Sequence, residues 1–598
     1  MSVSSFVQKL VPLDDLKATV LRFPLSVIST FAIFVVGVLM THEVIKDVDD
    51  DFIAKICAFL GCGYFWFGIC KLVAESRGWP LVRHMALAMA GVAALGYIVF
   101  VPFLWWLHLA FIAPALLLLV MVAAYLRKEG DDLSFWFFNR QVWFGVVVSY
   151  IALFMFAGGC SAALYAIEKL FDVKISGNVY FDMWLFASLV LGPVYALSWV
   201  PEKFTFTKDD CIDPPGLRFM ANWISVPMVL VYLLILYAYF GKIIVTGDVP
   251  KGVLAYMISG FIGAGVVAYL VSWPLREDGT AQLRLFHRIF FPAILVPTAF
   301  HFYAIWERVS AYGFTEQRYY LLLSAIWFAF LGLGFTFRKL PIKFIPGILA
   351  VLLIIGGIGP WSGVAVSGHS QFSRLEHLLV KDHLLVDGKI VKAEGELPIE
   401  DRVAIGSILD YLCNSDRDYM IADRFAFTGY SGEPCGHCIG GSALTEQLGF
   451  KYVTYYDRGE SSDEERISIT HYSGNFYAVT GYDYVLSAQN AYRSNVNPKK
   501  PCDSPDDPMA VCAVLDRDAN LIVYQGNKEL IRRNITDFVL AQWEKDKHAA
   551  LDKKDFYLDM ESEKVKMRVE FSSIYGEIKD GKPQVNNVSF NLLYSFKD

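Results

Sequence analysis

Two cysteines at positions 435 and 438 form the pair of residues with the clearest potential for chemistry in this sequence. They stand in the tetrapeptide Cys435-Gly436-His437-Cys438. Such a pair performs thiol–disulfide exchange when it opens a helix, because the helix dipole lowers the pKa of the first thiol. Here Pro434 precedes the pair, and Gly440 and Gly441, which interrupt a helix, follow it. We therefore favour a structural pair, and keep redox catalysis and metal binding with Cys413 as alternatives.

The region after residue 365 contains an odd number of cysteines, which limits how they can pair. In an oxidising compartment such cysteines tend to form disulfides. With five of them, at least one is free, pairs between chains or is buried. Cys502 and Cys512 flank the end of a proline-rich loop, so we predict a structural disulfide between them. The five residues are Cys413, Cys435, Cys438, Cys502 and Cys512.

His301 is the most unusual polar residue within the apolar part of the chain. It follows Pro292 and Pro297, and each proline removes a backbone hydrogen bond from a helix. A helix broken at this point, with a histidine near mid-depth, is a way to build a transporter site. The simpler interpretation, which we favour, is a kinked packing helix in which His301 bonds to a neighbouring span.

Three further polar residues complete the candidate polar site of the membrane region. His108 follows two tryptophans and is typical of an aromatic interface belt, with a pathway group as the alternative. Glu307 and Arg318 flank one short loop, and we expect them to form an ion pair at the interface. Thr315 lies in this loop, where we expect it to cap the following helix.

The segment Asp516-x-Asp518-x-Asn520 resembles the start of a calcium-binding loop. Leu521 stands where that loop needs glycine, and Asn527 stands where it needs glutamate. We therefore predict a plain hairpin turn and no metal site. The sequence also has no glycine-rich phosphate loop and no Gly-x-Ser-x-Gly elbow, so we expect no cofactor.

The elements that position these residues belong to two regions of different composition. Of the 598 residues, 55% are hydrophobic and 19% are charged, against about 25% charged in soluble domains. This excludes a disordered, a fibrous and a simple soluble protein. Crossing roughly 30 Å of hydrocarbon takes about 20 apolar residues. Eleven such stretches lie near 24–41, 53–73, 84–101, 103–126, 142–167, 180–200, 221–241, 252–273, 287–306, 319–337 and 342–363.

The basic residues between these stretches indicate their orientation. With the N-terminus inside, the inner segments hold 18 Lys and Arg and the outer segments hold 8, and basic residues are retained in the cytoplasm. The first stretch has no cleavage site, so we expect a signal anchor. An odd number of crossings then predicts a cytoplasmic segment 1–23, a transmembrane domain 24–365 and a periplasmic domain 366–598. A eukaryotic membrane with the last domain in a lumen fits the same number of crossings and the same distribution of basic residues.

The C-terminal region mixes helical and strand periodicity without regular alternation, so we predict a soluble α+β domain. Its net charge of −10 argues against nucleic-acid binding. Hairpins are expected at Val386-Asp387-Gly388-Lys389 and between residues 511–515 and 521–525. A long antiparallel pair is expected from residues 566–578 and 585–596. We also expect helices over 398–412, 443–448 and 536–547, and strands over 424–430, 452–456, 467–472 and 476–486.

Four short segments, taken in order, resemble a known family. They are Tyr312-Gly313-Phe314-Thr315-Glu316-Gln317-Arg318, Gly359-Pro360, Ser370-Gln371-x-x-Arg374-Leu375 and Leu385-Val386-Asp387-Gly388-Lys389-Ile390. They resemble an uncharacterised bacterial multi-pass family, domain of unknown function 4153. The resemblance implies an inner-membrane protein and supplies no activity, cofactor or catalytic residue. Independently of the resemblance, we expect Ser370 to cap a helix.

These observations predict a bacterial inner-membrane protein, a helical membrane domain of about eleven spans followed by a soluble α+β domain. We expect a role in envelope interaction, sensing or assembly rather than catalysis. The expected partners are the lipid bilayer and other envelope proteins. One alternative is a transporter or export component that uses the ninth span. The other is a periplasmic thiol–disulfide oxidoreductase that uses Cys435 and Cys438.

Overall fold

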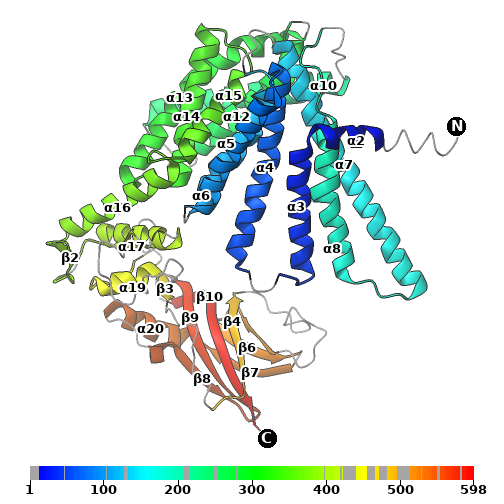
Figure 1. Ribbon diagram of the computed structural model, residues 1–598. Helices are drawn as coiled ribbons and strands as arrows, with labels where there is room; N and C mark the ends of the chain where they lie inside the picture. The colour runs from blue at the N-terminus through cyan, green and yellow to red at the C-terminus, as the bar shows by residue number, and fades with distance from the viewer. Residues whose placement is uncertain are drawn as a thin grey trace. The chain divides into compact units, whose positions relative to one another are not determined.

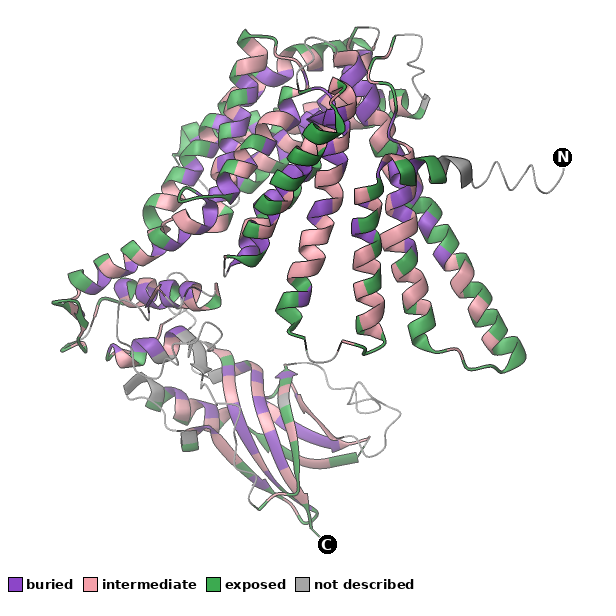
Figure 2. Cartoon of the chain, viewed as in Figure 1, coloured by how far each residue is buried: buried purple, intermediate pink, exposed green. Residues whose placement is uncertain are grey.

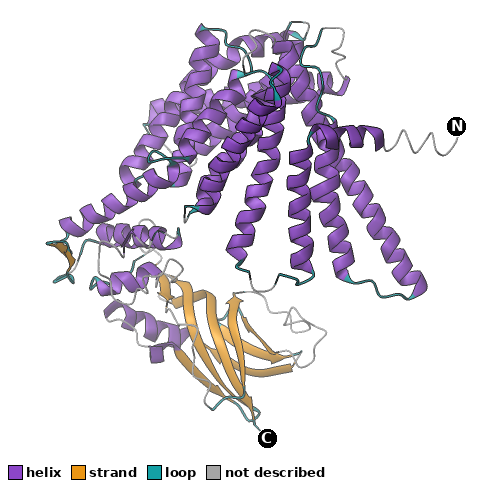
Figure 3. Ribbon diagram, in the orientation of Figure 1, coloured by secondary structure: helices purple, strands orange, loops and turns teal. Residues whose placement is uncertain are grey.

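The protein consists of two compact units, Met1–Arg374 and Leu375–Asp598, which we describe separately. The first is built from helices, and all the strands belong to the second (Figure 3). Helix α16, Gly363–Lys381, contains the boundary between the two units, which falls after Arg374. The computed structural model describes residues 13–45, 48–102, 104–126, 132–207, 215–247, 254–277, 279–395, 397–415, 417, 420–421, 440–453, 465–470, 481–493, 511–526, 528–548, 553–579 and 582–597.

Within the described part of the first unit, ten helical segments are long and apolar enough to cross a membrane. They coincide with the first ten predicted stretches (Figure 1). A short helix α2, Leu13–Arg22, precedes them. The segments are α3 Pro24–Thr41, α4 Asp50–Arg77, α5 Leu81–Phe100, α6 Trp105–Ala123, α7 Asp132–Phe171, Gly177–Ser198, Gly216–Thr246, Leu254–Arg276, α13 Ala281–Tyr312 and α14 Glu316–Phe337.

Three of these segments contain short turns of a different helix type. A π-helical turn joins two α-helices in Gly177–Ser198, and another precedes the long helix of Gly216–Thr246. A 3-10 turn ends Leu254–Arg276. The parts are α8 Gly177–Phe186, η1 Ala187–Leu191, α9 Gly192–Ser198, α10 Pro215–Phe219, η3 Met220–Ser225, α11 Val226–Thr246, α12 Leu254–Ser272 and η4 Trp273–Arg276.

The eleventh predicted stretch forms a shorter helix, α15, Phe344–Gly357, of 14 residues. At 1.5 Å per residue it is about 21 Å long. Just before α15, Lys343 Nζ donates to the carbonyl of Tyr125, beyond the end of α6, at 3.2 Å. At the other end, His108 Nδ1 in the first turns of α6 donates to the carbonyl of Gly357 at 2.7 Å. Residues 343–357 therefore lie antiparallel to α6, with Lys343 near its end and Gly357 near its start.

Polar contacts gather the helix ends into two opposite faces of this unit. At one face, Arg22 forms an ion pair with Glu75, at 2.7 Å between Nη2 and Oε2, and donates to the carbonyl of Val200 at 2.7 Å. At the other face, Trp105 Nε1 donates to Asp51 Oδ1 at 2.9 Å. The start of α3 and the ends of α4 and α9 therefore share one face, and the starts of α4 and α6 share the other.

The lateral surface of the unit is apolar, as contact with lipid requires. On α7, Phe154, Met155 and Leu170 are 60%, 74% and 79% exposed. Figure 2 shows exposed residues along the same helix. The interior is filled by aromatic rings such as Phe286 and Phe290, which are fully buried and 5.1 Å apart between ring centroids.

The second unit contains two antiparallel sheets and a short hairpin, as an α+β fold requires. The larger sheet has the order β3-β9-β10-β4, and β8 also pairs with β9. The smaller sheet has the order β5-β6-β7. The elements of the second unit after α16 are β1 Leu385–Val386, β2 Lys389–Ile390, α17 Ile399–Asn414, α19 Gly440–Gln447, β3 Glu465–Thr470, β4 Tyr484–Tyr492, β5 Val511–Leu515, β6 Asn520–Gln525, β7 Lys528–Asn534, α20 Thr536–His548, η6 Lys553–Phe556, β8 Tyr557–Glu561, β9 Val565–Lys579 and β10 Lys582–Phe596.

The expected hairpins are present with the expected geometry. Asp387 and Gly388 have φ values of 51° and 76°, as a two-residue turn between β1 and β2 needs. Strands β9 and β10 pair along their full lengths, with register shifts near Val585 and Ser589. The core of this unit lies between the larger sheet and α20, where Val539, Phe571 and Phe590 are buried.

Candidate functional site

The loop between α13 and α14 brings together two of the four segments that carry the family resemblance, the one that begins at Tyr312 and the one that begins at Ser370. Gly313 follows the end of α13 with a φ of 69°, a backbone conformation that favours glycine. A Cβ atom here would also lie 3.0 Å from Ser370 Oγ and from Gln371 Nε2 of α16. Glycine therefore lets α16 pack directly against this loop.

Side chains from α14 and α16 satisfy the polar backbone of the loop. Gln371 is 4% exposed, and its Nε2 donates to the carbonyls of Tyr312 and Phe314 at 2.8 and 2.7 Å. Ser370 Oγ accepts from the amide of Phe314 at 2.9 Å. Arg318 Nη1 donates to the carbonyls of Tyr312 and Gly313 at 3.1 and 2.6 Å. Ser370 is thus inside α16, which begins at Gly363, and the prediction that it caps a helix is wrong.

Three arginines surround the ring of Tyr312 at the end of α13. The guanidinium carbons of Arg308, Arg318 and Arg374 lie 5.8, 5.5 and 5.9 Å from the ring centroid. They come from three helices, α13, α14 and α16. Each is half-buried, and burial lowers the pKa of the Arg374 guanidinium from its usual value. We call these three residues the arginine cluster.

A pocket of about 180 Å³ lies beside the arginine cluster, between α12, α13 and α14. Glu307 and Arg318 both line it, but the ion pair expected between them is not formed, because Arg318 Nη1 turns to the loop carbonyls. Thr315 precedes α14 as expected, but its side chain makes no capping hydrogen bond. The polar side chains in the wall are Tyr256, Glu307, Arg308, Thr315, Gln317 and Arg318.

Comparison with known proteins places these residues in a family. A family model described as a domain of unknown function, DUF4153, matches residues 28–374. The chain belongs to this family. It is also 26% identical over 240 residues to the uncharacterized protein PM1469 of Pasteurella multocida (strain Pm70). That match covers 38% of this chain and 39% of the relative, so it spans about two fifths of the relative's length. No solved structure matches the chain.

The family match ends at Arg374, so it includes the whole arginine cluster and the pocket. The sequence analysis selected Arg318 and Glu307 but missed Arg308 and Arg374. A signal for them existed, because Arg374 stands inside one of the segments that carry the resemblance and Arg308 lies four residues before another. Nothing in their spacing showed that they meet at Tyr312, since that depends on how α16 returns over the loop.

Helix α13 is continuous through both prolines, as the favoured packing interpretation allows, and the alternative of a ninth span broken at this point is wrong. Pro297 cannot donate to the carbonyl of Ala293, four residues earlier. Tyr237 of α11 satisfies that carbonyl instead, with its hydroxyl donating at 2.9 Å. A neighbouring helix thus replaces the missing hydrogen bond, as required where water is excluded.

His301 is fully buried and joins three spans. Its Nε2 donates to the carbonyl of Leu321 at 3.2 Å, and lies 3.1 Å from Ser324 Oγ and 3.3 Å from Ser259 Oγ. These contacts link α13 to α14 and α12, as the packing interpretation expects. Its Nδ1 is buried without a hydrogen-bond partner. His301 does not line the pocket, although Leu321 does.

The remaining candidates fall into two groups. His108 satisfies the C-terminal end of α15, since it donates a hydrogen bond to the last carbonyl of that helix. Among the cysteines of the second unit, Cys413 and Cys512 are disulfide-bonded. Cys435, Cys438 and Cys502 lie outside the described residues, so the redox pair and the Cys502–Cys512 pairing stay predictions.

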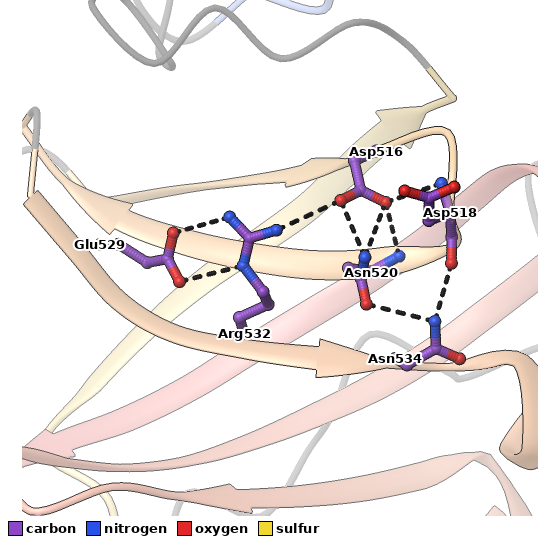
Figure 4. Close-up of polar contacts among 6 residues, drawn as sticks. All are labelled: Asp516, Asp518, Asn520, Glu529, Arg532 and Asn534. Atoms are coloured by element: carbon purple, nitrogen blue, oxygen red, sulfur yellow. Dashed lines mark hydrogen bonds and ion pairs between the residues drawn. The ribbon is translucent and has the colours of Figure 1, made fainter.

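The calcium-like segment forms the turn between β5 and β6 (Figure 4). Asp516 Oδ1 accepts from the amides of Asp518 and Asn520 at 2.9 and 2.8 Å, and Arg532 Nη1 lies 3.4 Å from Asp516 Oδ2. The carboxylate of Asp516 is therefore engaged within the protein, in a plain hairpin turn. Among the described residues, no group of three His, Cys, Asp or Glu side chains is arranged to hold a metal.

The packing role of His301 can be tested with a cysteine probe at Ser324. In the purified full-length protein, we expect the Ser324→Cys thiol to react with a water-soluble maleimide about tenfold more slowly than Gln317→Cys. Ser324 is half-buried and its Oγ lies 3.1 Å from Nε2 of the fully buried His301, so water reaches this position less readily than Gln317. Gln317 is the matched control, since it is exposed and lines the pocket. Equal labelling of the two cysteines would instead reveal water beside His301 and favour a transporter.

Proposed function

We propose that this protein holds its second unit on the outer face of a bacterial inner membrane, where that unit binds other envelope components without catalysis. The observation that carries this proposal is the contrast between its cysteines. Cys413 and Cys512 of the second unit are disulfide-bonded, whereas Cys57, Cys62, Cys70 and Cys160 of the membrane unit are free. Structural disulfides persist in the periplasm and are rare in the cytoplasm.

The parity of the membrane crossings supports the same placement. Ten long helices with a cytoplasmic N-terminus return the chain to the inner side. Helix α15 is shorter than these ten helices, but it lies antiparallel to α6, and we assign it as the eleventh crossing. The 18 to 8 distribution of basic residues favours this orientation. Residues 1–23 would then be cytoplasmic.

The second unit offers a surface suited to a binding role. Strand β4 ends the order of the larger sheet, and its Tyr484 is 54% exposed. The ring of Tyr484 stacks on Tyr594 at 5.2 Å and lies 6.2 Å from Phe596. We call these three residues the aromatic edge. Tyr484 lies on the edge strand β4, and Tyr594 and Phe596 lie on the neighbouring strand β10. Aromatic residues grouped at the edge of a sheet are typical of surfaces that bind another protein by strand addition.

Reporter fusions test the placement of the second unit. We expect alkaline phosphatase fused after Asp598 to be active in intact cells. A fluorescent protein fused at the same position should stay dark, because it is exported unfolded by the general secretory route. A fusion after Lys339, between α14 and α15, is the matched control and should give the opposite result. An inactive phosphatase after Asp598 together with an active one after Lys339 would contradict the proposal.

A photoreactive residue placed at Tyr484 in the same cells tests the binding role. We expect crosslinked adducts of discrete mass that are lost when Tyr594 is replaced by serine. Tyr575 of β9 is 41% exposed and lies outside the aromatic edge, so it serves as the control position. Identical adducts from both positions would show random collision rather than a binding surface.

A further inference from the structure

The arginine cluster forms no ion pair with the residues that the structure describes, although Glu307 lines the same pocket. No described aspartate or glutamate forms an ion pair with Arg308, Arg318 or Arg374, whereas Arg22 pairs with Glu75 and Arg276 with Glu277. Half-buried charges of the same sign repel one another and lose hydration. An anion at this place would recover that free energy.

The guanidinium groups also keep hydrogen-bond donors available. Arg318 uses only Nη1 on the loop carbonyls, and within the described residues its Nε and Nη2 have no partner. Arg308 and Arg374 make ring contacts with Tyr312 and no hydrogen bond to a described residue. The planar fork of arginine matches the oxygen geometry of phosphate and carboxylate groups.

The surroundings of the pocket fit the headgroup depth of a bilayer. Its inner wall is apolar, formed by residues such as Leu254, Ala304 and Leu321, and its charged residues lie at the helix ends. On the neighbouring turn of α13, Tyr303 and Trp306 are 53% and 72% exposed, as in the aromatic belt of membrane proteins. Tyr319 donates to the carbonyl of Trp361 at 2.7 Å, so the end of α15 and the start of α14 share this face.

We propose that this pocket binds the phosphate group of a membrane phospholipid, with the arginine cluster donating to the phosphate oxygens. The volume of about 180 Å³ admits a headgroup rather than a whole ligand, since pockets for drug-sized molecules hold roughly 300–1,000 Å³. The acyl chains would stay in the bilayer. Glu307 in the same wall favours a headgroup that carries an amine beside its phosphate.

Lipid binding to the purified full-length protein tests this proposal. The probes are short-chain phosphatidylethanolamine, phosphatidylglycerol, diacylglycerol and inorganic phosphate, each measured by native mass spectrometry. We expect one tightly bound phospholipid, stronger binding of phosphatidylethanolamine than of phosphatidylglycerol, and no comparable binding of diacylglycerol. In R308Q and R374Q we expect affinity to fall about tenfold per arginine, as for the loss of a charge-assisted hydrogen bond.

Replacing Arg308 or Arg374 by glutamine should preserve the fold, because neither arginine donates a hydrogen bond to a described residue. Arg318 is left unchanged because it braces the loop. Arg338→Gln at the opposite end of α14, where the arginine is exposed, is the matched control and should bind lipid like the parent. Unchanged unfolding midpoints for all variants show that the loss is local. Equal lipid binding by parent and R308Q/R374Q, or equal binding of diacylglycerol, would overturn the proposal. Binding of inorganic phosphate alone would overturn the assignment to lipid.

Discussion

Replacing Gly145 by alanine is expected to destabilise the membrane unit by about 3 kcal/mol or more, because the added methyl group has no room. Gly145 lies on α7, and a Cβ atom there would be 2.1 Å from the Cβ of Trp199, at the end of α9. The Cβ of Trp199 is fixed to its backbone, so the two helices must separate. Thermal unfolding of the purified protein in detergent measures the effect.

The same helix supplies the control for this substitution. A Cβ atom at Gly158 of α7 meets nothing within 4 Å. Gly158→Ala should therefore be neutral, or stabilising by up to about 1 kcal/mol through helix propensity. If Gly145→Ala unfolds at the same temperature as Gly158→Ala, the close packing of α7 on α9 is refuted.

Replacing Cys512 by serine is expected to destabilise the second unit by about 3 kcal/mol, the typical contribution of a disulfide. Cys512 lies on β5, an edge strand of the smaller sheet, and is disulfide-bonded. Losing the covalent link increases the conformational entropy of the unfolded chain and frees this strand to separate. The rate of proteolysis of the second unit within the full-length protein, followed over temperature, measures the loss.

A free cysteine of the membrane unit gives the matched control for the disulfide. Cys160 is half-buried on α7 and free, so Cys160→Ser should leave the proteolysis rate unchanged. Reducing the parent protein should accelerate proteolysis at least as much as Cys512→Ser does, because Cys413 is disulfide-bonded as well. If reduction has no effect on the parent, the disulfides do not support this fold, and the argument for an oxidising compartment weakens with it.

Elements with a strong local signal could be predicted from the sequence. The stretch predicted over 24–41 is α3, Pro24–Thr41, and the stretches predicted over 84–101 and 103–126 are the separate helices α5 and α6. The hairpin of β1 and β2 followed from Asp387-Gly388 alone. Strands whose identity depends on pairing were harder. Strand β4, Tyr484–Tyr492, continues beyond the strand predicted over 476–486, whose first part lies outside the described residues. Strand β8 was not predicted, because edge strands are defined by their neighbours.

The sequence by itself determined that this chain crosses a membrane many times and carries a separate α+β unit. A membrane helix satisfies its own backbone hydrogen bonds, so it can be recognised from the length and apolar composition of its own segment of sequence. Only the tertiary structure decided what the polar residues do. Tyr237 replaces the hydrogen bond lost at Pro297, and Arg308, Arg318 and Arg374 meet at one ring although they come from three helices. Such contacts depend on how distant helices pack, which no local pattern encodes.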